Sequence, residues 1–229
     1  MAVILNIETS TNVCSVALTF DGYVIGQRED YQGRNHAALL SGYIQAMLDI
    51  ANEKELKLDA IAVSIGPGSY TGLRIGLSEA KGLAYALGIP LIGVDTLKAM
   101  TVSVMFSDFF DENVVFVPMI DARRMEVFTA VHDFGLNELM NPQPLILNED
   151  SYLKYLEKGP VIFFGNGSDK AREIIKHNNA NFITEIHPLA CNMIALAEKA
   201  YMDQDFLDLA YSVPAYLKEF QATVPRNRI

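Results

Sequence analysis

The stretch SIGPGSYTGLRIG at residues 64–76 joins an apolar run to a helical pattern and places two glycines around a proline at the junction. Ser69 or Thr71 can cap the helix that follows, and a helix N-terminus favours anions. The stretch has neither the lysine of G-x-x-x-x-G-K-[ST] nor the third glycine of G-x-G-x-x-G in its usual place. Its spacing therefore favours a structural turn. If it binds a nucleotide or another anion, the candidate loop residues are Gly66, Gly68, Ser69 and Thr71.

Strand and helix patterns alternate on both sides of this turn. Residues 2–7 form a short apolar run, and residues 14–20 place apolar side chains on one face with a period of two. Asp21-Gly22 is typical of a tight hairpin, so residues 23–31 are expected to return antiparallel. The predicted order of the first lobe is β-β-β-α-β-α-β. Its later elements are a helix over 35–51, a strand over 59–65, a helix over 71–88 and a strand over 90–94.

Helix ends and a domain boundary follow from the same reading. Asn35 and Asp95 are predicted N-caps, and Gly88 is a predicted C-cap. A loop rich in phenylalanine and aspartate, SDFFDEN, then marks a boundary near residue 110. We expect residues 1–110 to form an N-terminal lobe and residues 111–229 a smaller C-terminal lobe. The second lobe is predicted to hold a strand pair about Ala122 and Arg123, a strand, glycine turn and helix over 161–175, and an apolar helix over 189–202.

Composition restricts the class of protein. The 229 residues include 28 acidic and 18 basic side chains, a net charge of −10, so nucleic acid would be repelled unless a local basic patch overrode the field. Cys14 and Cys191 are far apart and form no C-x-x-C pair. No apolar run reaches the roughly 18 residues that a membrane helix needs, and the start of the chain does not read as a signal peptide. These features predict a cytoplasmic globular protein.

Three segments together resemble one known family. They are IETSTNVCSVAL at 7–18, GPGSYTGLRIGLSEAKGLAYALGIPLIGVDTL at 66–97 and IDARRMEVF at 120–128. They resemble the TsaB (YeaZ) family, the dimerisation subunit of the bacterial tRNA threonylcarbamoyladenosine synthesis complex, and the resemblance extends to 212–217. It implies an α/β fold of two lobes, actin-like and sugar-kinase-like (ASKHA, RNase H-like). The β-β-β-α-β-α-β order read from the sequence agrees with that fold.

A catalytic relative of this family, TsaD, has the same ETS turn and GPG loop but continues as N-H-x-x-G-H, with two metal-binding histidines. This chain continues as DTLKAM, so Asp95 takes the place of the asparagine, and Thr96 and Met100 take the places of the histidines. Neither side chain replaces an imidazole ligand. The four histidines, His36, His132, His177 and His187, are scattered, and exposed or capping roles are expected for them. No catalytic or metal-binding residue is predicted.

Two other polar groups have more than one reading. Asp121 and Glu126 flank a strand turn and could be catalytic carboxylates or partners of Arg123 or Arg124 across a hairpin. Gly165-Asn166-Gly167 could meet an adenosine across a cleft or form a plain strand-to-helix turn. The ETSTN turn differs from the D-x-G-T form of ATP-using members of the fold, because Glu8 is longer than aspartate and Ser10 replaces a glycine.

The two predicted helices of the first lobe carry more apolar surface than one buried face needs. On the helix over 35–51 apolar residues cover roughly 200° of the circumference, about twice the stripe of a surface helix. On the helix over 71–88 the side opposite the leucines holds small residues. Either both helices are enclosed in the fold, or they form a protein interface. The predicted interface residues are Leu39, Tyr43, Ala46, Ile50, Ile75, Ser78, Gly82 and Ala86.

The resemblance implies a non-catalytic scaffold that binds a metal-bearing TsaD-type catalytic subunit, with a TsaE-type P-loop ATPase, for threonylcarbamoylation of adenosine next to the tRNA anticodon. No cofactor is then bound by this chain alone: ATP or ADP and metal belong to partner subunits or to a shared interface, and tRNA is met only through the complex. Without its partner the chain is expected to form a homodimer. The alternatives are an ATP-dependent phosphotransferase or metallopeptidase of the same fold, and a self-sufficient regulatory homodimer.

Overall fold

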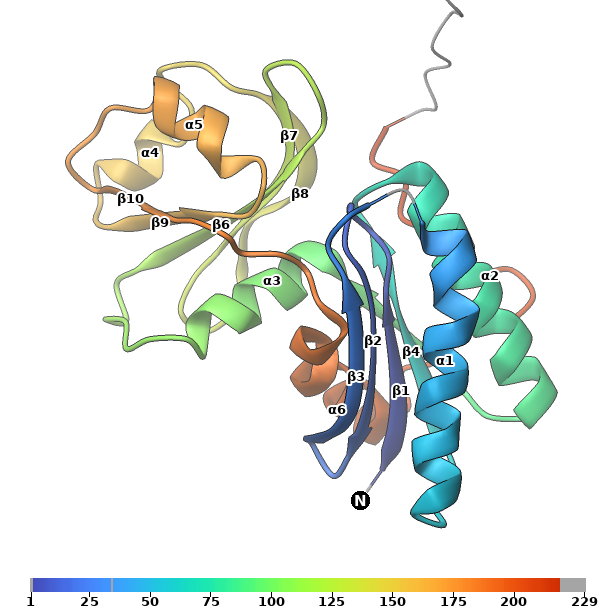
Figure 1. Ribbon diagram of the computed structural model, residues 1–229. Helices are drawn as coiled ribbons and strands as arrows, with labels where there is room; N and C mark the ends of the chain where they lie inside the picture. The colour runs from blue at the N-terminus through green and yellow to red at the C-terminus, as the bar shows by residue number, and fades with distance from the viewer. Residues whose placement is uncertain (1, 34, 219–229) are drawn as a thin grey trace, which may run out of the picture.

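Two five-stranded sheets organise the computed structural model, which describes residues 2–33 and 35–218 (Figure 1). The first sheet has the order β3-β2-β1-β4-β5. Strands β1, β2 and β3 form an antiparallel meander, and β4 and β5 continue parallel to β1. The bounds of its strands are β1 Val3–Glu8, β2 Cys14–Phe20, β3 Tyr23–Asp30, β4 Ala60–Gly66 and β5 Leu91–Asp95.

Helices cover both faces of the first sheet. Helices α1 (His36–Glu53) and α2 (Tyr70–Leu87) lie on one face, where Val3, Leu5 and Ile7 meet them. On the other face Ile4 packs with the C-terminal helices η1 (Ala190–Met193) and α6 (Ile194–Asp203). Strand β1 is therefore buried on both sides, which explains why its sequence is a continuous apolar run and not an alternating one.

The predicted order of the first lobe is confirmed, and so are most of its turns. Asp21 and Gly22 both have positive φ, and Gly88 ends α2 in the left-handed conformation. The Asp95 carboxylate caps α3 (Thr96–Met105) by accepting a hydrogen bond from the Lys98 amide at 2.7 Å. Asn35 lies at the N-cap position of α1, but its side chain makes no capping hydrogen bond.

The second sheet has the order β10-β9-β6-β7-β8. Its strands are β6 Val115–Asp121, β7 Glu126–His132, β8 Glu138–Ile146, β9 Val161–Phe164 and β10 Ala180–Ile183, and its helices are α4 Leu153–Leu156 and α5 Ser168–Ile174. Strand β8 escaped the sequence reading because Pro142 and Pro144 interrupt it. It lies at the edge of the sheet, where a proline without an amide hydrogen is tolerated.

Helix α3 connects the two sheets. Ala99 packs on the first sheet, whereas Leu97 and Val104 pack with Phe116 and Phe164 of the second. In Figure 1 the helix crosses between the lobes. Side chains on opposite sides of α3 thus join the apolar cores of the two lobes. This shared packing favours a fixed orientation of one lobe relative to the other.

The C-terminal part of the chain returns to the first lobe. Residues 190–201 pack on the first sheet, and the amide of Leu207 donates to the carbonyl of Leu91 on β5 at 2.8 Å. The division into 1–110 and 111–229 stays a prediction as a domain boundary. It does not describe the packing of residues 190–217, which lie against the first sheet and α2, because their apolar side chains complete the core of that lobe.

Candidate functional site

A cleft of about 520 Å³ opens between the lobes at the carboxyl ends of β1 and β4. In folds of this kind the carboxyl ends of parallel strands are the usual place for a ligand. The first lobe contributes the turn after β1 and the start of α2, and the second lobe contributes the β6–β7 turn and Asn166. The end of the described chain, residues 215–218, forms a further part of the wall.

Glycines on one side of α2 let the turn after β1 approach closely. A Cβ atom on Gly68 would lie 2.2 Å from the carbonyl oxygen of Ser10, and one on Gly72 would lie 2.1 Å from that of Thr9. These separations are far below van der Waals contact, and the obstructing atoms belong to the backbone. The spacing of glycines along this segment therefore serves close packing of helix against turn.

The candidate anion loop uses part of its hydrogen-bonding capacity within the fold. The Ser69 amide donates to the Ser10 carbonyl at 2.6 Å, and the Ser69 hydroxyl caps α2 by accepting from the Gly72 amide at 3.2 Å. Gly66 has a φ of 109°, which a residue with a side chain rarely adopts. These contacts agree with the structural reading of GPGSYTG. Anion binding by Gly66, Gly68, Ser69 and Thr71 stays a prediction.

Glu8 is directed into the protein and does not line the cleft. It is fully buried, and its Oε1 accepts from the Ser10 amide at 2.6 Å and from the Ser64 hydroxyl at 3.0 Å. Burial raises the pKa of this carboxyl above its ordinary value, against the opposing effect of those hydrogen bonds. Its Oε2 has no hydrogen-bond partner among the described residues. Glu8 thus stabilises the turn after β1, and its carboxylate is not presented to a ligand.

Buried side chains fill the two positions where the family resemblance places the metal ligands of the catalytic relative. Thr96 and Met100 are both fully buried, and Met100 belongs to the apolar cluster between α3 and the second sheet. The Met100 methyl group lies against the turn after β9, 2.5 Å from where a Cβ atom on Gly165 would be. A thioether in an apolar cluster and a lone threonine hydroxyl do not fit an iron or zinc ion.

Two of the four histidines, His36 and His132, are buried, whereas exposed or capping roles were expected for all four. His132 hydrogen-bonds Thr101 at 2.9 Å through Nδ1, and since the Thr101 hydroxyl donates to the Leu97 carbonyl, this Nδ1 must donate. Burial lowers the pKa of His132 to about 4. His36 contacts the Val13 carbonyl, whereas His177 accepts from the Asn179 amide, as a capping group does. The structure brings no two of these four rings together in one site.

The second-lobe wall of the cleft holds two lysine–carboxylate pairs. Lys170 contacts Asp121 at 2.6 Å, and Lys218 forms an ion pair with Glu126. The sequence left open a pairing of these carboxylates with the side chains of Arg123 or Arg124, but their ion-pair partners are the two lysines. Of the two arginines, only the backbone amide of Arg123 reaches Asp121, at 2.7 Å. Both lysines are distant in sequence from their partners, so hairpin spacing could not reveal them.

Asn166 is also used within this wall. Its side-chain oxygen accepts from the Asp121 amide at 2.8 Å, and Gly165 takes a positive φ between β9 and α5. The segment is thus a strand-to-helix turn with one exposed amide side chain at the cleft. Its role toward an adenosine stays a prediction.

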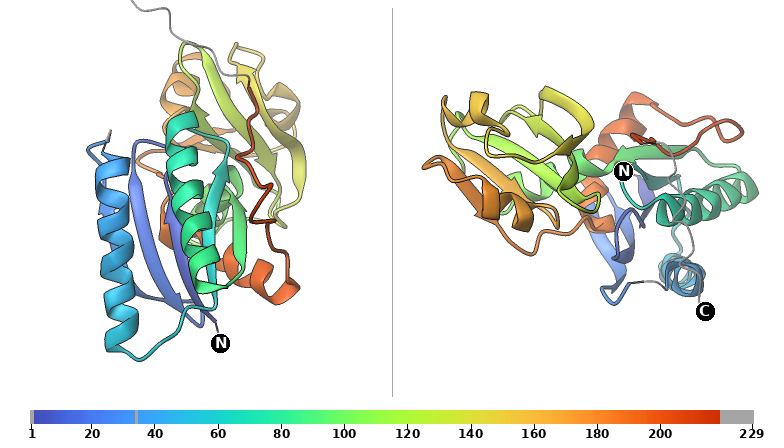
Figure 2. Two further views of the ribbon diagram at one scale, coloured as in Figure 1. Left: turned by 90° about the vertical axis from the view of Figure 1, so that its right-hand side faces the viewer. Right: turned by 90° about the horizontal axis from the view of Figure 1, so that it is seen from above.

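The C-terminal segment is the part of the site that sequence reasoning missed. Figure 2 shows it running beside α2 toward the second lobe. Lys81 of α2 donates to the carbonyls of Ala210 and Ser212, and Arg74 donates to the Tyr216 hydroxyl at 2.8 Å. The amide of Ala215 then bonds the Ile65 carbonyl at 2.7 Å. These contacts fix one side of α2 against its own chain, although no local pattern in the segment announces them.

The outer faces of α1 and α2 are uncovered within the described part of the chain. The predicted interface residues of α1 (Leu39, Tyr43, Ala46 and Ile50) are half-buried, and those of α2 are half-buried at Ile75 and exposed at Ser78, Gly82 and Ala86. Three of the half-buried residues of α1, together with Ile75, pack against the core of the first lobe. The eight residues therefore do not form one exposed patch.

The exposed surface of α1 is a different set of small and polar side chains. Ala38, Ser41 and Gly42 face outward, and Ser41 donates to Glu79 of α2 at 2.6 Å. A Cβ atom on Gly42 or Gly82 would meet nothing within 4 Å, so both glycines border open space. The spacing of four residues between Ala38 and Gly42, repeated between Ser78 and Gly82, is the sequence signal that could have identified this surface.

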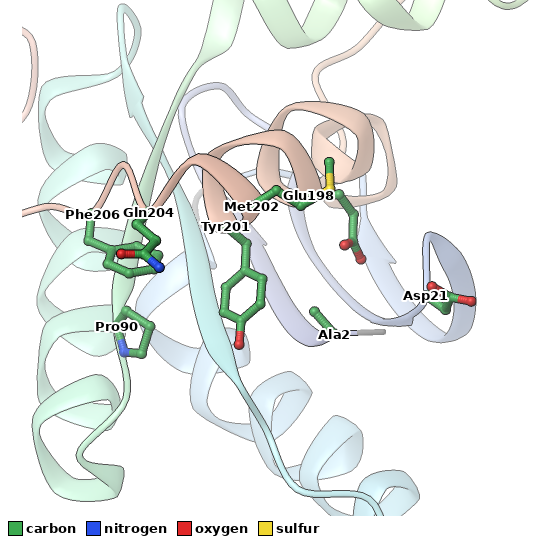
Figure 3. A pocket seen from close by; sticks show the side chains of 8 residues that line it. All are labelled: Ala2, Asp21, Pro90, Glu198, Tyr201, Met202, Gln204 and Phe206. Carbon is green, nitrogen blue, oxygen red and sulfur yellow. The ribbon is translucent and has the colours of Figure 1, made fainter.

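A second hollow lies at the other end of the first lobe. It has a volume of about 480 Å³, and Figure 3 shows Tyr201 and Phe206 beside Ala2 and Pro90, with Glu198 near the β2–β3 hairpin. Glu198 accepts a hydrogen bond from the Gly22 amide at 3.2 Å. The hollow thus marks where α6 meets the strand ends. No helix of the described residues has the length and apolar character that crossing a membrane requires.

Comparison with known proteins gives a consistent set of similarities. The family model described as "TsaD: tRNA N6-adenosine threonylcarbamoyltransferase" matches residues 26–226. The tRNA threonylcarbamoyladenosine biosynthesis protein TsaB of Bacillus subtilis is 32% identical over 76% of this chain and 75% of its own length. The Haemophilus influenzae protein of the same name is 29% identical over 94% of this chain and 93% of its own.

Solved structures add a likeness of fold. YeaZ from Pseudomonas aeruginosa superposes with a TM-score of 0.78 at 24% identity, over 95% of this chain and all of that one. A second crystal structure, described as an uncharacterized protein with similarity to peptidase YEAZ from Pseudomonas aeruginosa, has a TM-score of 0.81 at the same identity and coverage. Together with the TsaD family model and the two mixed sheets, these likenesses confirm the predicted α/β, two-lobe fold of the ASKHA type.

Proposed function

The chain belongs to the TsaB (YeaZ) family, and from this premise we propose that it is a non-catalytic scaffold subunit in the biosynthesis of tRNA threonylcarbamoyladenosine. Its proposed partner is a TsaD-type catalytic subunit that bears the metal. A TsaE-type P-loop ATPase joins the complex, and ATP or ADP belongs to these partners or to a shared interface. The chain meets tRNA only as part of that assembly, and it pairs with itself when the partner is absent.

The observation that carries this proposal is a contrast between a buried site and an exposed one. At the positions of the relative's metal ligands, Thr96 and Met100 are fully buried in packing. On the outer side of α1 and α2, by contrast, Gly42 and Gly82 border open space and are flanked by small side chains. Small residues let a second pair of helices approach within the usual interaxial distance of about 8–10 Å. Thr96 and Met100 thus offer no imidazole at these two positions, and the open space beside Gly42 and Gly82 supports the proposed helix packing.

The mode of association follows from the same surface. A self-complementary helical face pairs with a copy of itself by a two-fold axis, and a related chain with matching helices can replace that copy. A heterodimer with the catalytic relative and a homodimer would then compete for one face. The competition explains how one surface serves both states.

Co-expression with the TsaD-type subunit tests the proposal. Size-exclusion chromatography with light scattering should give a mass equal to the sum of the two chains, and the homodimer of the isolated chain should disappear as partner is added. Separate elution at all concentrations would refute it. Steady ATP turnover or about one tightly bound metal ion per isolated chain would instead favour a phosphotransferase or a metallopeptidase.

A further inference from the structure

The β6–β7 turn presents two arginines at the mouth of the cleft. Arg123 lines the cleft and Arg124 is exposed beside it. Neither guanidinium forms a hydrogen bond, an ion pair or a ring contact with any residue of the described chain. The chain has a net charge of −10, so two neighbouring cations without a carboxylate partner make this turn a locally positive site on a negatively charged protein.

The backbone of this turn is unusual for residues with long side chains. Arg123 has a φ of 70° and Arg124 a φ of 51°, so two consecutive residues other than glycine adopt the left-handed region. Such a conformation costs free energy and persists only where the surroundings hold it. Strained residues of this kind are concentrated at functional sites.

Lys170 is the group that holds the turn. Its ammonium donates to Asp121 at 2.6 Å and to the backbone carbonyls of Arg124 and Glu126 at 2.9 and 2.5 Å. Its side chain is 15% exposed, whereas the Asp121 side chain is 49% exposed, so the network is partly open to water. The Asp121 carboxylate also accepts from the Arg123 amide. A half-buried ammonium thus fixes the loop, and the guanidinium groups of Arg123 and Arg124 take no part in this network.

The charges around the turn do not cancel the arginines. Asp121 is matched by Lys170 and Glu126 by Lys218, so both carboxylates of this hairpin already have a cationic partner. Among the described residues, Arg123 and Arg124 are the charged groups of this turn without an ionic partner. Exposed guanidinium groups on a rigid loop suit phosphate oxygens, which they contact in a bidentate manner.

The opposite wall supplies aromatic side chains. Tyr70 and Tyr216 lie with ring centroids 4.9 Å apart, and the Arg74 guanidinium lies 4.0 Å from the centre of the Tyr70 ring. Both rings line the same cleft as Arg123. Cationic groups beside aromatic faces are the combination that RNA-binding surfaces use for backbone and base.

We propose that the Arg123–Arg124 turn is a phosphate contact for the RNA substrate, so that this chain contributes directly to holding tRNA within the complex. The inference rests on the proposed function, which brings RNA to the molecule. It adds that contact with RNA is not left to the catalytic subunit alone. Because two contacts are weak against a net charge of −10, the turn mainly positions RNA that the assembly binds, and the isolated chain is expected to bind RNA only weakly and at low salt.

The test compares the wild-type chain with Arg123→Gln/Arg124→Gln, in the assembled complex and as the chain alone. The probe is a fluorescent RNA hairpin with the sequence of a tRNA anticodon stem-loop, titrated over a series of KCl concentrations. The double variant should bind more weakly and reduce the slope of log affinity against log salt by about 1 to 2, as expected for losing one or two phosphate contacts. Arg123→Lys/Arg124→Lys should retain most of the slope.

Lys54→Gln/Lys57→Gln is the matched control, because it removes the same charge from exposed positions after the end of α1, at the far end of the first lobe (Figure 1). An unchanged salt slope in an intact complex would overturn the inference and leave the proposed function standing. Loss of co-elution in the arginine variant would assign the turn to a protein interface, which also overturns it.

If no complex assembles, the proposed function fails, and the chain alone decides the inference. Arginine-dependent, salt-sensitive binding of the hairpin by the isolated chain would still support the contact. Equal binding by wild type, variant and control, or none at all, would overturn it.

Discussion

Thr9 and Gly72 are joined in two ways across the base of the cleft. The Thr9 hydroxyl donates to the Gly72 carbonyl at 2.8 Å, and the Thr9 carbonyl oxygen lies 2.1 Å from where a Cβ atom on Gly72 would be. The turn after β1 therefore rests directly on the first turns of α2. Any side chain at position 72 must push the backbone of one element away from the other.

Gly72→Ala is accordingly expected to lower the free energy of unfolding by about 1–3 kcal/mol, the usual cost of overpacking. Gly82→Ala is the control in the same helix. Its added methyl group meets nothing within 4 Å, so it should stabilise the protein by roughly 0.5–1 kcal/mol through helix propensity. Urea unfolding followed by circular dichroism measures both. A destabilisation of equal size in the two variants would contradict the close approach seen at Gly72.

Gly82→Arg is expected to abolish binding of the catalytic relative and leave the fold of the isolated chain intact. The position is exposed and borders open space, so the arginine can be accommodated in the monomer but would separate two closely packed helices. Ala195→Arg, at an exposed position of α6 away from α1 and α2, is the matched control. Co-elution and thermal unfolding are measured together.

Retention of the partner by the Gly82 variant would remove this face from the interface. Tyr43→Glu, in contrast, is expected to lower the unfolding temperature as well, because Tyr43 is half-buried against the core of the first lobe. A drop in stability at position 43 with none at position 82 is the pattern that the packing of α1 and α2 predicts.

Acid should destabilise the protein through His132. Burial lowers its pKa to about 4 in the fold, against about 6.5 in the unfolded chain, so the unfolded state binds the proton first. Its contribution to stability is complete above pH 6.5 and is lost as pH falls toward 4, by an amount up to about 3 kcal/mol. His132→Gln keeps a donor for Thr101 and should flatten this part of the curve. A steep loss that persists in the variant would assign the acid sensitivity to other groups.

Asp95 should give a pH dependence of the opposite sign. Burial raises its pKa from 3.8 to about 6, so the folded state retains the proton longer, and stability is lost as pH rises from about 4 to 6. Asp95→Asn keeps an oxygen for the Lys98 amide and removes the buried charge. The variant should be more stable than wild type at pH 7, by up to about 3 kcal/mol, and equal to it near pH 3.5. Thermal unfolding at both pH values checks the crossover.

The sequence by itself determined the first lobe and its turns. Period-two and helical spacing are local properties of the chain, so they predicted the order β-β-β-α-β-α-β, the Asp21-Gly22 hairpin and the cap at Gly88. The family resemblance, and not the periodicity, implied that Thr96 and Met100 stand where the catalytic relative has its metal ligands. Strand β8 was missed because its prolines obscure a strand pattern that is tolerated only at a sheet edge.

Only the tertiary structure decided which distant groups share the cleft. Lys170 lies 49 residues from Asp121, and Lys218 lies 92 residues from Glu126, so no spacing rule could pair them. For the same reason the return of residues 190–217 to the first lobe was not readable in advance. Hydrophobic periodicity records which side of an element is buried, whereas a site depends on which elements the completed core brings into contact.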